Sequence, residues 1–343
     1  TSIISLFIFI LFINTNSISD ENNIKYYSGD KGILSLMYHR FNEHQYPSTN
    51  IQMNIFKEQI EIIRNSNYAF SHPKQFEENF SVPKANKEIL ITIDDAFQSF
   101  YLEAWPYFKR NKIPFILFVS TEPVGKKGYM TWDQIKEVEA EKFTSIGHHS
   151  HSHGYLIDGD NDLFSSDIEK ANKIFLKNLG YIPNLFSYPF GEYSKFMRDY
   201  ISQNFDYAFG QHSGVIDLNK DKFELPRFPI NENYGDLKRF SSIINSFPLE
   251  YEQLLPLEKN LSAENNPPNF QVKFFNEQKN IKSINCYSNE LDKWEKSNTS
   301  LNNKILTIKF RGPFIPRRGR INCSLNDNGK WRWFGVQFPI KEN

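Results

Sequence analysis

The sequence predicts an α/β fold over most of the chain, followed by a smaller all-β segment. Between residues 32 and 246, short apolar runs alternate with stretches whose apolar residues recur at helical spacing. The apolar run at 89–93 ends in two adjacent carboxylates, as a buried strand with polar groups at its C-terminal end would. From residue 269 onward the apolar stretches are short and alternating, which is typical of antiparallel strands. We therefore expect a parallel sheet or barrel followed by a small β-sandwich.

Each predicted element of the first region has a local pattern behind it. The predicted strands are apolar runs at 32–39, 89–93, 114–119, 143–147, 184–190, 207–210 and 225–230. The predicted helices are at 54–64, 99–110, 131–140, 162–179, 194–203 and 235–246. The clearest helix is 162–179, where Ile168, Ala171 and Phe175 share one face and Gly180 suits the C-cap. Chemistry in such folds is found where the parallel strands end.

The composition divides the chain into regions. Residues 20–250 are expected to form the α/β domain, 251–268 a polar linker with a Pro pair, and 269–343 the β-sandwich. Within the last region, the Asn-Asp-Asn-Gly sequence at 326–329 predicts a hairpin turn. Cys286 and Cys323 are either disulfide-bonded or two buried free thiols.

The N-terminal stretch and the charge balance bear on location and partners. Residues 1–19 carry no charge, and an apolar run from Ile3 to Ile13 is followed by small residues around Ser17 and Ser19. This predicts a signal peptide and an exported protein, either periplasmic, in the cell envelope or extracellular; an uncleaved anchor is the alternative. Lys plus Arg and Asp plus Glu number 40 each, so no basic face for nucleic acid is expected.

Four residues have the character of a metal site. His149 and His153 are four residues apart, and on one helical turn that spacing places both rings on one side. Imidazole and carboxylate ligands suit a divalent metal, most naturally zinc, with a position left for water. One of Asp94 and Asp95 can complete the ligand set, while the other remains off the ion and accepts a proton from water.

Three motifs in order resemble the polysaccharide deacetylase family, also called carbohydrate esterase family 4 or the NodB homology domain. Thr-Ile-Asp-Asp-Ala at 92–96 resembles the first family motif, and His149 to His153, soon after Ile146-Gly147, resembles the second. Pro-Phe-Gly at 189–191 resembles the third. The resemblance covers roughly residues 30–245 and implies a distorted (β/α) barrel with metal-dependent removal of acetyl groups from sugars.

The resemblance also implies a role for each residue. Asp95, His149 and His153 would be the metal ligands and Asp94 the catalytic base. The motif gives His148 and His151 no role as ligands. A backbone N–H near Pro189, Phe190 and Gly191 would hold the oxyanion. Tyr38-His39-Arg40 resembles the opening strand of a branch that acts on bacterial exopolysaccharides.

The sequence departs from the family pattern at three places. Ala96 replaces the Gly of the first motif, which removes backbone freedom from that turn. Ser187 and Tyr188 stand where an Arg often precedes the third motif, and Arg227 is the candidate to orient the base instead. The general acid of the family is a late His, for which His212 is the candidate.

We therefore expect a metal-dependent hydrolase that removes N-acetyl groups from a GlcNAc-type polysaccharide. The alternatives are a non-catalytic carbohydrate-binding protein on this fold, or an enzyme acting on O-acetyl esters or small-molecule amides. Aromatic side chains at the rim of the site, among them Tyr188, Tyr193 and Trp132, are candidates to stack on sugar rings or to pack in the core. Trp331 and Trp333 share one side of a strand and suit either sugar binding or a sandwich core.

Overall fold

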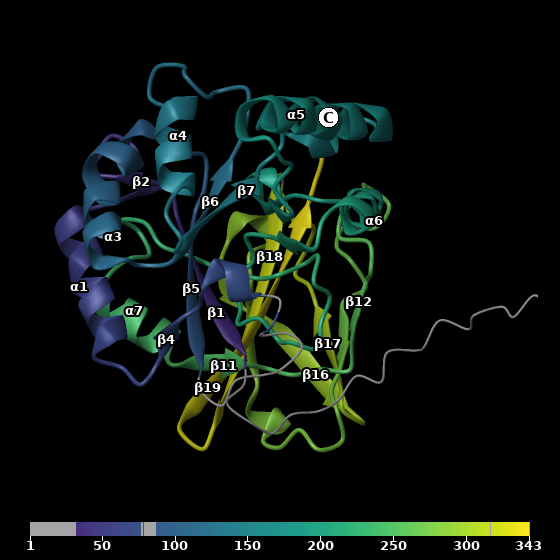
Figure 1. The fold of residues 1–343 in the computed structure, drawn as a ribbon. Coiled ribbons are helices and arrows are strands. Elements are labelled where there is room, and N and C mark those ends of the chain that lie inside the picture. The colour runs from purple at the N-terminus through teal and green to yellow at the C-terminus, as the bar shows by residue number, and fades with distance from the viewer. Residues whose placement is uncertain (1–31, 77, 79–86, 316, 343) are drawn as a thin grey trace, which may run out of the picture.

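The computed structural model describes residues 32–342 apart from 77, 79–86 and 316. The predicted signal peptide at 1–19 lies outside the described residues. In Figure 1, helices α1, α3 and α4 lie to one side of strands β5 and β6, and the C-terminal strands lie to the other. Among the described residues, the structure has no helix that combines the length and the apolar character needed to span a bilayer.

A parallel sheet forms the first part of the chain. Its strands follow the order β10-β1-β5-β6-β7-β8-β9, and the short β4 (Ala69–Phe70) pairs with the start of β5. The bounds are β1 (Ile33–Tyr38), β5 (Glu88–Ile93), β6 (Phe115–Val119), β7 (Thr144–His148), β8 (Leu185–Ser187), β9 (Tyr207–Phe209) and β10 (Phe228–Pro229). β1, β5 and β6 are buried along their whole length, as expected for strands covered on both faces.

The segment 225–229 closes this sheet into a distorted barrel. Leu225 bridges to Phe209 in β9, and three residues later Phe228 pairs with Leu36 in β1. All of these pairings are parallel. Arg227 lies between the two pairings, so its position is fixed from both sides.

Helices cover the outside of the barrel, where their apolar faces meet the strands. Phe56, Ile60 and Ile63 on one face of α1 are fully buried, in agreement with the predicted spacing. The bounds are α1 (Met53–Arg64), α3 (Trp105–Asn111), α4 (Trp132–Glu139), α5 (Asn161–Leu179), α6 (Lys195–Asn204) and α7 (Leu237–Ile244). Thr131 forms a capping box at the start of α4, and Gly180 takes a left-handed conformation after α5. The pair β2 (Arg40–Phe41) and β3 (Asn50–Ile51) precedes α1.

Two further sheets form the C-terminal part. One has the order β11-β19-β18-β14-β15 and the other β12-β13-β17-β16. The strands are β11 (Ser246–Pro248), β12 (Gln253–Leu255), β13 (Gln271–Lys273), β14 (Asn285–Ser288), β15 (Glu295–Lys296), β16 (Asn298–Asn302), β17 (Ile305–Lys309), β18 (Arg318–Asp327) and β19 (Lys330–Pro339). The predicted hairpin turn joins β18 to β19, with Asn328 and Gly329 both at positive φ.

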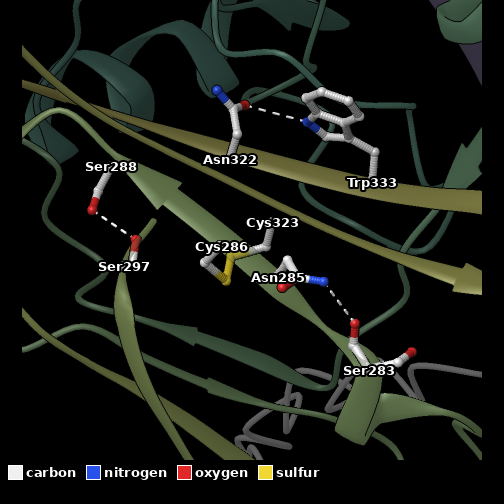
Figure 2. Close-up of a disulfide and its surroundings, with 8 residues drawn as sticks. All are labelled: Ser283, Asn285, Cys286, Ser288, Ser297, Asn322, Cys323 and Trp333. Carbon is white, nitrogen blue, oxygen red and sulfur yellow. Dashed lines mark hydrogen bonds between the residues drawn. A yellow bond between two sulfur atoms is a disulfide. The ribbon is translucent and has the colours of Figure 1, made fainter. Parts of the chain in front are cut away.

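Cys286 and Cys323 form a disulfide between adjacent strands, which resolves the choice left open by the sequence. They are directly opposed in the pairing of β14 with β18, and both are fully buried. Figure 2 shows the disulfide beneath β19, with the Trp333 indole donating to Asn322 nearby.

The two parts of the chain are in close contact. β11 pairs with β19, so the chain enters the C-terminal sheets directly after α7. A side chain at Gly335 in β19 would place its Cβ only 2.1 Å from the carbonyl oxygen of Ser213. Trp333 packs edge-on against Phe228 of the barrel, which shows a core-packing role for this side chain. The division near residue 250 remains our proposal; the predicted linker at 251–268 contributes β12 to a sheet.

Candidate active site

The polar ends of neighbouring parallel strands meet at one rim of the barrel. Asp94 and Asp95 follow β5, His39 follows β1, and His149 follows β7. Asp95 has a φ of 74° and Ala96 a φ of 51°, so the backbone turns through the left-handed region where the family motif has a Gly. Such a conformation costs of order 1–3 kcal/mol for a residue with a side chain and is found mainly at functional sites.

Asp95, His149 and His153 converge on one point. Asp95 Oδ1 lies 3.3 Å from His149 Nε2 and 3.0 Å from His153 Nε2. One ligand atom from each of the three residues lies within 4.8 Å of those of the others, as in a set that holds one ion. Burial opposes ionisation of Asp95, but His153 and His149 outweigh it and hold its pKa well below the ordinary value. The carboxylate is therefore charged.

The orientation of His149 fits a metal ligand. Its Nδ1 lies 2.6 Å from the Ser187 carbonyl oxygen, to which only a protonated ring nitrogen can donate. The lone pair of Nε2 therefore points at Asp95. Asp95 Oδ1 and His149 Nε2 are buried and make no hydrogen bond among the described residues. Two buried lone-pair atoms that face each other are well suited to a cation between them.

The second motif reaches this arrangement without the helical turn that the spacing suggested. Residues 149–153 form an irregular loop in which Ser150 and His153 have positive φ values of 69° and 51°. Asp167 holds the loop from outside, because its carboxylate accepts from the backbone N–H groups of His151 and Ser152 at 2.7 and 3.1 Å. The two rings still face the same ion position, but loop geometry places them there.

Asp94 is held by the buried Arg227. The guanidinium donates to both carboxylate oxygens, with distances of 2.7 and 2.8 Å. Its other three N–H groups donate to Thr92 Oγ1, Ser187 Oγ and the Gly210 carbonyl, so all five donors are used. Burial opposes ionisation of Asp94, but Arg227 and His149 outweigh it and the pKa lies below its ordinary value. Asp94 is therefore an ionised carboxylate that lies 4.0 Å from His149 Nε2.

His39 is a site residue whose role the sequence reasoning missed. It directly follows Tyr38, which pairs with Ile93, so it lies beside Asp94 at the strand ends. Burial lowers the pKa of His39 below its ordinary value, although the charges of Asp95 and Asp94 oppose this effect. The available signal was the position of His39, one residue beyond the first predicted strand.

His212, the residue predicted as general acid, lies elsewhere. It lines a cavity of about 500 Å³ between the barrel and the C-terminal strands, together with Lys259 and Gly335. Burial, together with the neighbouring charges of Lys259 and Arg227, lowers the pKa of His212 to about 4. A neutral His in a separate cavity is poorly placed to donate a proton at the rim of the barrel.

The third motif forms a strained turn beside the metal set. Phe190 has a φ of 58°, and its ring packs edge-on against His153 at a centroid distance of 4.7 Å. The N–H groups of Tyr188, Gly191 and Glu192 all donate to backbone carbonyls, and Pro189 has none. Within this turn the Phe190 N–H is left as the donor for a ligand.

The remaining candidates lie outside the convergent set. His148 is enclosed by Phe175, Phe186 and Phe205, and burial lowers its pKa to about 3. His151 lies 2.8 Å from Thr121 Oγ1 and faces away from the triad. Of the two roles open to Tyr188 and Tyr193, the structure shows core packing, because their exposed fractions are 0% and 3%. Trp132 is half-buried and packs on Phe175.

Comparison with known proteins identifies a domain family for part of the chain. Residues 81–208 match the family model described as polysaccharide deacetylase. A poly-beta-1,6-N-acetyl-D-glucosamine N-deacetylase of Staphylococcus aureus is 22% identical over 201 residues, which cover 54% of this chain and 69% of the relative.

Solved structures have the same barrel. IcaB from Ammonifex degensii matches with a TM-score of 0.55 and 25% identity, over 63% of this chain and 97% of that one. The deacetylase PplD of Streptococcus pyogenes, solved with acetate, matches with a TM-score of 0.54 and 22% identity, over 59% and 94%. Each match therefore spans nearly all of the solved structure but only about three fifths of this chain. Residues 81–208 of this chain therefore carry a polysaccharide deacetylase domain.

Proposed function

We propose that the protein is an exported, zinc-dependent N-deacetylase of a GlcNAc-type polysaccharide. The observation that carries the proposal is the pair of neighbouring carboxylates in different surroundings. Asp95 faces His149 and His153 with unsatisfied atoms, while Asp94 is clamped by Arg227. The Staphylococcus aureus relative is named for a poly-beta-1,6-N-acetylglucosamine substrate, and this supports the same class of polymer here.

Asp95, His149 and His153 would hold the ion. Zinc bound by two His and one carboxylate lowers the pKa of water and polarises a carbonyl oxygen. Asp94 accepts the proton of the attacking water. It can do so at neutral pH because Arg227 keeps it ionised, and because five hydrogen bonds keep Arg227 in place.

The other two residues act on the two ends of the amide. As water adds to the acetyl carbon, the Phe190 N–H donates to the oxygen that becomes negative. His39 then donates a proton to the amine nitrogen as the C–N bond breaks, and acetate and a free amine result. Burial lowers the pKa of His39, and the neighbouring charges of Asp95 and Asp94 oppose that effect.

Export is part of the proposal. The Cys286–Cys323 disulfide suits an oxidising compartment, as does the apolar segment at the N-terminal end of the sequence. Cell fractionation tests this part of the proposal: the mature protein should be found outside the cytoplasm.

The function is tested by acetate release from N-acetylated and O-acetylated glycans. Oligomers of β-1,6-linked GlcNAc, chitin oligomers and an O-acetylated polymer are compared, each with and without a chelator and with zinc restored. We expect release from the N-acetylated β-1,6-linked oligomers, loss on chelation and recovery with zinc. Activity that persists after chelation contradicts the mechanism, and release from O-acetyl groups alone contradicts the substrate class.

A further inference from the structure

We infer that the C-terminal sheet is a working part of the active site. In this inference, which rests on the proposed function, Gln337 and Arg317 are positioning residues for the turn at 189–191 and for His153. Gln337 lies in β19 and Arg317 directly precedes β18, more than a hundred residues beyond the motifs they contact.

Gln337 hydrogen-bonds to the backbone of the turn at 189–191. Its side-chain Nε2 donates to the carbonyl oxygens of Phe190 and Gly191, both at 3.0 Å. Phe190 and Gly191 both have positive φ, at 58° and 67°. Gln337 is 2% exposed, and its Oε1 accepts from Arg320, which fixes the orientation of the amide. Two carbonyls of a strained turn are thus satisfied by one side chain of another sheet.

Arg317 ends a stack of side chains that reaches a metal ligand. Its guanidinium lies 3.7 Å from the ring centroid of Tyr155. Tyr155 is stacked on Phe190, with centroids 4.1 Å apart and planes inclined by 18°. Phe190 in turn meets the His153 ring edge-on. A contact on one side of the stack therefore limits where Phe190, and with it His153, can move.

Charge pairs hold the arginines at this position. Arg317 pairs with Asp158, which ends the short helical turn after Tyr155. Arg318 Nε donates to Glu192 at 2.9 Å, and Glu192 immediately follows the Phe190–Gly191 turn. Both pairs join the C-terminal sheet to segments that flank the site. The contact of Trp333 with Phe228, by contrast, is apolar packing between rings.

Loss of Gln337 and loss of Arg317 should change different measured quantities. Loss of the Gln337 donors frees the turn that presents the Phe190 N–H, so kcat falls while KM for the polymer changes little. Loss of the Arg317 stack loosens His153, so zinc binds more weakly. Partners that support ligands and catalytic groups from behind typically change affinity or activity by about 10–100-fold.

The test uses the full chain with Gln337→Met, which keeps the side-chain length without donors, and Arg317→Gln. Arg317→Lys keeps the charge without the planar stacking group. Arg311→Gln is the matched control, because Arg311 pairs with Glu290 and Glu295 within the C-terminal sheets. Thermal unfolding checks that each variant is folded, and competition with a zinc-binding dye gives the zinc Kd independently of activity.

We expect about a tenfold fall in kcat for Gln337→Met, and about a tenfold weaker zinc Kd for both Arg317 variants, relative to Arg311→Gln. A folded Gln337→Met with kcat within about twofold of wild type overturns the role of Gln337, and a zinc Kd equal to that of the control overturns the role of Arg317. If wild type binds zinc but releases no acetate, the proposed function fails, and the zinc titration still decides the stack.

Discussion

The two halves of the proposed site, one for the metal and one for proton transfer, differ in how their polar atoms are satisfied, although Asp95 and Asp94 are neighbours in the chain. Asp95 faces His149 and His153 with buried atoms that no described donor satisfies. Asp94 and Arg227 satisfy each other, and the guanidinium has no donor to spare. A group that must receive a ligand is left incomplete, whereas a group that must keep one ionisation state is saturated with partners.

The largest effects on activity should come from neutralising each of the two carboxylates in turn. Asp95→Asn removes the charged ligand, so we expect loss of bound zinc and acetate release at background. Asp94→Asn keeps the ligand set but removes the base, so we expect a fall in kcat of about 10²–10⁴-fold with one zinc still bound. Metal analysis of purified protein, alongside acetate release, makes the distinction. Zinc lost from Asp94→Asn, or kept by Asp95→Asn, would show that the roles are reversed.

Substitution of Arg227, the partner of Asp94, should lower the free energy of unfolding more than substitution of a metal ligand. Arg227→Met leaves the Asp94 charge buried without its partner, which costs about 3–5 kcal/mol in free energy of unfolding. Chemical denaturation measures this cost. The double variant Asp94→Asn, Arg227→Met is the control, because removing the charge as well should restore part of the stability. If the double variant is no more stable than the single one, the cost comes from lost packing.

The two candidate acids should separate next. His39→Gln should lower kcat about 100-fold with zinc still bound, because His39 lies beside Asp94 at the strand ends and the other nearby ring, His149, is assigned to the ion. His212→Gln should leave kcat near wild type, because this side chain lines a separate cavity. Kinetics on the same N-acetylated oligomer measures both. The reverse pattern would return the role of acid to His212.

The smallest expected effect is on how the melting temperature depends on pH. The pKa of Asp94 in the folded protein lies below its ordinary value near 4, so the unfolded state binds the proton more readily. The stabilisation is therefore complete above about pH 5 and is lost as the pH falls toward the folded pKa. In chelator-treated protein, the melting temperature of wild type should fall more steeply below pH 5 than that of Asp94→Asn. Parallel curves for the two proteins would contradict the sign.

The sequence predicted the barrel and the metal half well because both depend on local patterns. Asp94, Asp95 and His149 directly follow apolar strands, and parallel strands bring their C-terminal ends to one rim. Asp95, His149 and His153 therefore came together as expected, although a loop with left-handed residues replaced the expected helical turn.

The remaining residues depend on contacts that no local pattern encodes. In the sequence, His212 and Tyr188 stand at or just after apolar runs, as the site residues do. In the structure His212 lines a separate cavity and Tyr188 is buried in the core. Tertiary packing decides which side of a strand end faces the site. Gln337 lies 147 residues from Phe190. Nothing in the sequence of its strand distinguishes a Gln that supports a distant turn from any other polar residue of a strand.

The closing segment of the barrel has a consequence for the order in which the working protein comes into being. The metal ligands are complete once residue 153 has been made, but Arg227 and Gln337 are made much later. Until the segment 225–229 bridges β9 and β1, Asp94 has no guanidinium beside it, and burial would favour its neutral form. The residues assigned to the ion are therefore made well before those that hold the base, and the proposed hydrolysis requires the C-terminal part of the chain as well as the motifs.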